Sequence, residues 1–103
     1  MVQKIIINRG SSRFKFSQEA LEYLHKKKVE GVIKQGIYKL KFNLVTIDLR
    51  TNKHAIKIVK DLGPGASGDL ALLKVIEIPN NVKWHIAQLG NSEYIREDAR
   101  EWR

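Results

Sequence analysis

Residues 62–79, LGPGASGDLALLKVIEIP, constrain the fold of this chain more than any other stretch. Residues 52–63 before the glycines predict a helix, with Asn52 or Thr51 as its N-cap and an apolar stripe of Ala55, Ile56, Val59 and Leu62. Residues 72–79 after them form an apolar run that suits a strand. Gly63 suits the left-handed residue that ends a helix, and Pro64 prevents the helix from continuing. The stretch therefore predicts a helix, a tight turn and a strand that belongs in the centre of a sheet.

The order of these elements also limits what the turn can bind. Phosphate-binding loops of the Walker and dinucleotide types run from a strand through glycines into a helix, and the Walker loop needs a Gly-Lys-Ser/Thr sequence. Here a helix precedes the glycines, and no Gly-Lys-Ser/Thr follows. We expect a structural turn. One alternative remains, an anion-binding nest of backbone amides at Gly65, Ala66, Ser67 and Gly68 that binds a nucleotide or other small molecule, with Arg96 or Arg100 as a clamp.

The first half of the chain contains two further predicted elements. Residues 4–8, KIIIN, are β-branched and predict a strand. Ser17 is a helix N-cap before residues 18–28, and Phe16 with Leu21 has the spacing of a hydrophobic staple. Residues 29–36 favour no single state. Residues 37–51 alternate as a strand, with a phase slip near residue 45 that predicts a bulge, a bend or an end buried on both faces.

The second half ends in a predicted β-hairpin, with strands over residues 82–89 and 93–98 around Gly-Asn-Ser. Trp102 is expected to pack back onto the domain. At 103 residues the chain has the length of one domain. We therefore predict a single α+β domain over residues 1–103, mainly an antiparallel sheet with two helices packed on one face and a C-terminal β-hairpin.

Charge divides the chain into two unequal halves. Residues 1–60 hold fourteen Lys or Arg against four acids, and residues 61–103 hold five against seven, so the net charges of +10 and −2 sum to +8. Aromatic residues are interleaved with the basic ones near residues 13–16 and 38–41. A solvated surface, a protein partner with an acidic surface and a nucleic acid all fit this pattern. The candidate contact residues are Arg9, Arg13, Lys15, Lys26, Lys27, Lys28, Lys34, Lys39 and Lys41.

No spacing in the chain favours catalysis. The absence of cysteine excludes disulfides, thiolate nucleophiles and cysteine metal sites. The three histidines fall on three predicted elements, so no metal site and no cofactor are predicted. Ser67 does not match a nucleophile elbow in spacing or context. The acids Glu93, Glu97 and Asp98 are expected to form a solvated face near two arginines. We predict a protein that is not an enzyme, and the lack of a leader or of a long apolar run predicts a cytoplasmic location without a membrane.

A set of short motifs extends along most of the chain: Ile7–Asn8, Phe14 to Ser17, Leu62–Gly63, Ala66–Ser67–Gly68, Glu77–Ile78–Pro79, Val82 and Trp84, Glu93, Glu97, Arg100 and Trp102. In these motifs the chain resembles a small family of uncharacterised proteins carried by bacteriophages and large DNA viruses. Relatives often have Cys-x-Gly-Gly where this chain has Arg9 to Ser12, and many are acidic, so cysteine chemistry is not carried over.

The resemblance implies a viral accessory protein that works in the cytoplasm of a host cell, and it implies no activity. The leading hypothesis is non-covalent binding of an acidic host partner, with inhibition of a host defence or regulatory factor as the outcome. Nucleic-acid binding through the basic half and nucleotide binding at the glycine-rich turn are the alternatives. The identity of the partner and the oligomeric state are left open.

Overall fold

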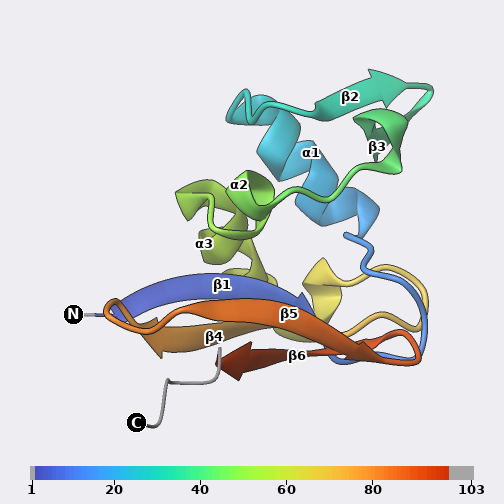
Figure 1. Cartoon of the computed structure of the whole chain (residues 1–103). Helices are drawn as coiled ribbons and strands as arrows, with labels where there is room; N and C mark the ends of the chain where they lie inside the picture. Colours follow the sequence, from blue (N-terminus) through green and yellow to red (C-terminus); the bar gives the residue numbers. More distant parts are fainter. Residues whose placement is uncertain (1, 98–103) are drawn as a thin grey trace, which may run out of the picture.

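A layer of helices lies between two groups of strands in the computed structural model, which describes residues 2–97 (Figure 1). Within these residues every pair of strands is antiparallel: β1 with β4, β2 with β3, and β5 with β6. The single α+β domain and the C-terminal hairpin are therefore confirmed. In chain order the elements are β1 (Val2–Asn8), α1 (Gln18–Lys26), β2 (Val32–Gln35), β3 (Ile37–Leu40), the 3-10 turn η1 (Lys41–Asn43), α2 (Ile47–Arg50), α3 (Lys53–Leu62), the 3-10 turn η2 (Gly63–Ala66), β4 (Leu73–Pro79), β5 (Trp84–Leu89) and β6 (Ser92–Glu97).

Both longer helices begin as their sequences predict, and α3 also ends where predicted, whereas α1 ends at Lys26, two residues before its predicted end. The Ser17 hydroxyl accepts a hydrogen bond from the Ala20 amide at the start of α1, and the Asn52 side chain accepts from two amides at the start of α3. Gly63 ends α3 with a φ of +56°, and its amide donates to the Val59 carbonyl. The buried positions of α3 differ slightly from the predicted apolar stripe, because Ile58 is buried whereas Ile56 is only half-buried.

Strand β1 is buried on both faces. Its three isoleucines, residues 5–7, are at most 1% exposed. Side chains alternate across a strand, and Ile6, which lies opposite Val75 of β4, belongs to the core under the helices. Ile5 therefore faces the other side, where β6 packs against β1. The β5–β6 hairpin thus covers the face of β1 that the helices leave open.

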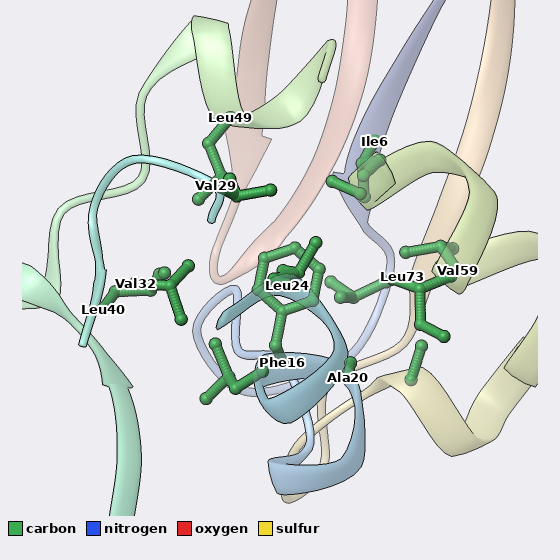
Figure 2. Packing of buried hydrophobic residues seen from close by; sticks show 14 residues of the cluster. Ile6, Phe16, Ala20, Leu24, Val29, Val32, Leu40, Leu49, Val59 and Leu73 are labelled. Carbon is green, nitrogen blue, oxygen red and sulfur yellow. The ribbon is translucent and has the colours of Figure 1, made fainter. Parts of the chain in front are cut away.

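The main core lies between the β1–β4 pair, the helices and the β2–β3 hairpin. Phe16 and Leu24 lie at its centre in Figure 2, with Val59 and Leu73 on one side and Val32 on the other. Phe16 and its predicted staple partner Leu21 both belong to this core. In Figure 1 the helices separate β2–β3 from the other strands. Helix α1 therefore packs against β2 and β3, whereas α3 packs against β1 and β4.

Two predictions about strands were wrong. Residues 37–51 do not form one strand: β3 ends at Leu40, Phe42 and Asn43 adopt φ values of +57° and +53°, and the chain then forms α2. The predicted phase slip near residue 45 marks this change of structure. Strand β4 is not central, because within residues 2–97 it pairs with β1 alone. The expected packing of Trp102 lies outside the described residues.

Candidate functional site: a basic groove beside strand β3

The glycine-rich turn holds the segment before α1 in an extended shape. Phe16 and Ser67 form an isolated antiparallel bridge, the Gly68 amide donates to the Lys15 carbonyl at 2.7 Å, and the Ser17 amide donates to the Ala66 carbonyl at 2.8 Å. The Ser67 amide donates to the Pro64 carbonyl. Two of the four amides of the predicted anion nest are thus engaged inside the chain, and the nest stays a prediction.

The loop after β1 is packed against the backbone before β4. The Arg9 amide donates to the Leu72 carbonyl at 2.7 Å, and the Ser11 amide donates to the Leu70 carbonyl at 3.0 Å. A Cβ at Gly10 would lie 2.6 Å from the Leu72 nitrogen, so only glycine fits between these two backbones. Backbone contact between the two segments thus continues past the ends of β1 and β4, and it fixes where residues 13–16 lie.

Residues 13–16 alternate between cations that face solvent and aromatic rings that face the protein. Arg13 and Lys15 are exposed, whereas Phe16 is buried and Phe14 is half-buried. The two rings meet edge to face, with their centroids 5.3 Å apart, and the Arg50 guanidinium lies 4.5 Å from the centroid of Phe14. The rings therefore anchor the segment while its two cations point outward.

Strand β3 forms the facing wall of the site. The side-chain amide of Gln18, on the first turn of α1, donates to the Tyr38 carbonyl at 2.7 Å and accepts from the Tyr38 amide at 2.9 Å. The Tyr38 ring contacts the His25 ring, whose centroid is 5.3 Å away, and the Lys34 ammonium lies 5.3 Å from the Tyr38 centroid. Gln18 thus ties β3 to α1.

Between these two walls lies a groove of about 660 Å³, which we call the basic groove. Three cations and one carboxylate line it: Arg13, Lys15 and Lys39 against Asp69. The rest of its surface is mainly apolar. Its apolar and aromatic lining residues are Phe14, Phe16, Leu21, Ile37, Tyr38, Leu40, Val45 and Leu70, and its polar ones are Ser12, Gln18 and Asn43. An anionic ligand with apolar groups fits this combination.

The other predicted contact residues lie outside the basic groove. Arg9 is exposed on the loop after β1. The cations at the end of α1 lie at the opposite end of that helix from Gln18; among them Lys26 pairs with Glu22 at 3.7 Å. Lys34 lies over Tyr38, and Lys41 lines a second hollow of about 530 Å³ beside Phe42. The remaining two, Lys27 and Lys28, are exposed.

Behind the groove lies a buried ion pair that sequence reasoning missed. Arg50 of α2 donates two hydrogen bonds to Glu93 of β6, at 2.7 and 2.8 Å, and the two residues are 8% and 3% exposed. The prediction that Glu93 belongs to a solvated acidic face was wrong. Arg50 also donates to the Ile6 carbonyl, so the pair joins α2, β1 and β6.

The protonation state of the Glu93 carboxyl depends on two opposed effects. Burial alone raises the pKa of a carboxyl, whereas hydrogen bonds from Arg50 and the Asn8 amide, together with the Arg50 charge, lower it. The net result is a Glu93 pKa below its ordinary value, so the carboxylate stays ionised at neutral pH.

Asn8 continues the same network toward the groove. Its backbone amide donates to the Glu93 carboxylate at 2.8 Å, and its side-chain oxygen accepts from the amides of Gly10 and Leu72. Its side-chain nitrogen donates to the Ser12 carbonyl. Asn8 is fully buried, so one side chain holds the loop at the start of the groove wall.

Residues 2–97 contain neither a cluster of metal ligands nor a membrane-spanning helix. No three His, Asp or Glu side chains in that range lie close enough together to share a metal ion. None of the helices there combines the length and the apolar character that crossing a bilayer requires.

Comparison with protein-family models, with curated proteins and with solved structures gave no match. The resemblance to proteins of bacteriophages and large DNA viruses therefore stays a prediction. What the chain can bind follows from the basic groove itself.

Proposed function

We propose that this protein acts by non-covalent binding of an acidic partner protein, a segment of which lies in the basic groove. The observation that carries the proposal is the convergence of Arg13, Lys15 and Lys39 on one apolar groove. Cations on the rim of an apolar groove attract a segment that combines carboxylates with apolar side chains. If the viral resemblance holds, the partner is a host protein.

The aromatic side chains of the groove favour a protein segment over a nucleic acid. Single strands bind by stacking bases on open aromatic faces. Phe16 is buried, Phe14 is half-buried with Arg50 over its ring, and the Tyr38 ring contacts both the His25 ring and the Lys34 ammonium. The remaining apolar surface is aliphatic, which suits leucine-like or valine-like side chains better than bases.

The test uses fluorescence anisotropy with three labelled probes: two eight-residue peptides of four glutamates and four leucines, one alternating and one in helical order, and a twelve-residue oligothymidine. The groove variant R13Q/K15Q/K39Q is compared with the control K53Q/K74Q/K83Q, whose three lysines are exposed and outside the groove. Each variant loses three charges, so both fall from +8 to +5.

We expect at least one peptide to bind, and the groove variant to bind it about tenfold more weakly than the control variant does. That figure follows from roughly 0.5 kcal/mol for each of three exposed ion pairs. Added salt should weaken the binding. Equal losses in the two variants would show a general charge effect and refute the groove as the site. Tighter, groove-dependent binding of oligothymidine would favour nucleic acid as the ligand.

A further inference from the structure

The edge of β3 that faces α1 is closed by a side chain instead of a strand. Tyr38 lies opposite Lys34 of β2, and the Lys41 amide bonds to the Gly31 carbonyl farther along the hairpin. Bonded and non-bonded pairs alternate in an antiparallel ladder, so the Tyr38 amide and carbonyl point away from β2. Both of these backbone groups form hydrogen bonds with the side-chain amide group of Gln18.

Gln18 copies the hydrogen bonding of a neighbouring strand. A glutamine side chain carries the same N–H and C=O as a peptide group, and here it donates to and accepts from a single residue of β3. Gln18 is exposed, and both of its hydrogen bonds lie at the surface. A peptide group from another chain can replace it without a net loss of hydrogen bonds.

We propose that the acidic segment binds as a third strand on the edge of β3 and displaces the Gln18 side chain. This inference rests on the proposed function, because it specifies how the same groove holds its ligand. Strand addition of this kind obtains affinity from main-chain hydrogen bonds and specificity from alternate side chains. β3 has four residues, so a ligand segment of about the same length, roughly 13 Å, pairs with it.

The cations of residues 13–16, across the groove from β3, determine which sequence the bound ligand strand needs. Arg13 and Lys15 lie two residues apart on an extended segment and are both exposed. Two residues of extended chain span about 6.6 Å, which is also the spacing of side chains on one face of a bound strand. A segment in which acidic and apolar residues alternate therefore presents successive carboxylates to Arg13 and Lys15 and its apolar residues to the opposite side.

The two acidic peptides of equal composition separate this mode from other binding in the groove. Isotope-labelled protein is titrated with each peptide and followed by NMR, through the side-chain NH₂ signals of Gln18 and the backbone amide of Tyr38. We expect the alternating peptide to bind at least fivefold more tightly than the helical one. At saturation the Gln18 signals should move to the position of a free glutamine side chain, while the Tyr38 amide stays protected from hydrogen exchange.

A variant provides an independent readout. In Q18A the edge of β3 is vacant, so the alternating peptide should bind about fivefold more tightly, whereas Q35A, an exposed glutamine of β2, should leave binding unchanged. Unmoved Gln18 signals at saturation, or equal affinity for the two peptides, refute strand addition but leave the proposed function intact. If neither peptide binds, the proposed function fails as well.

Discussion

Replacing Glu93 with alanine should destabilise the protein more than a change at its surface does. Among residues 2–97, the substitution leaves the Arg50 guanidinium, 8% exposed, with the Ile6 carbonyl as its remaining hydrogen-bond partner, and it removes the acceptor of the buried Asn8 amide. Breaking a buried pair in this way costs about 3–5 kcal/mol. A domain of this size has about 5–15 kcal/mol of stability, so the expected loss is a large fraction of the total.

The assay is urea and thermal unfolding followed by circular dichroism. A loss of about 3 kcal/mol lowers the Tm of a domain of this size by roughly 12 °C or more. The double variant R50M/E93L removes both charges together, so it should be more stable than E93A. The control D61A breaks the exposed pair of Lys57 and Asp61, 2.9 Å apart, and should change stability by less than about 1 kcal/mol. A loss in E93A no larger than in D61A would refute the argument.

The same pair predicts how stability depends on pH. The folded-state pKa of Glu93 lies below the ordinary value of 4.5, so the ionised form is favoured by folding. Its contribution is fully present above about pH 4.5 and is lost as the pH falls through the lower folded-state pKa. Below pH 4.5 the wild type should therefore lose stability more steeply than R50M/E93L, measured by urea unfolding at successive pH values. Parallel curves for the two proteins would contradict this assignment.

Three further substitutions test how the groove wall and α3 are built. G10A should lower stability by roughly 2 kcal/mol in urea unfolding, because its Cβ would meet the Leu70 carbonyl; an unchanged midpoint would show that the loop can move. G68A should weaken peptide binding in the anisotropy assay with a smaller loss of stability, because its Cβ would lie 2.6 Å from the Lys15 Cγ; unchanged affinity would exclude this effect on Lys15. N52A should cost about 1 kcal/mol through loss of the α3 N-cap, and a change below about 0.3 kcal/mol would contradict the capping role.

Local signals were enough to predict the elements that have strong caps and periodicity. Ser17 and Asn52 mark helix starts, and Gly63 with Pro64 marks a helix end, because these residues satisfy or block backbone hydrogen bonds within one turn. The alternation over residues 37–44 predicts a strand with one buried apolar face, and this prediction is wrong beyond Leu40. Phe42 and Leu44 are instead 84% and 59% exposed, and the backbone reverses between them.

The candidate site was predicted only in part, because local sequence signals do not show which residues the fold brings together. Arg13, Lys15 and Lys39 were among the predicted contact residues, but nothing local separates them from the other six cations, since the groove forms only when β3 lies beside residues 13–16. The Arg50–Glu93 pair joins residues 43 positions apart, and Gln18 binds a strand 20 positions away. Contacts of this range depend on the three-dimensional fold, and a single sequence carries no periodic signal for them.

The pairing of β1 with β4 has a consequence during synthesis. Val2 lies opposite Pro79, so the first strand leaves the ribosome long before its partner has been translated. At about 5–20 residues per second, the isoleucines of β1 wait roughly 4–15 seconds without the strand that later pairs with them. During that interval a β-branched apolar segment is open to other nascent chains, and a chaperone that shields it would raise the yield of native protein.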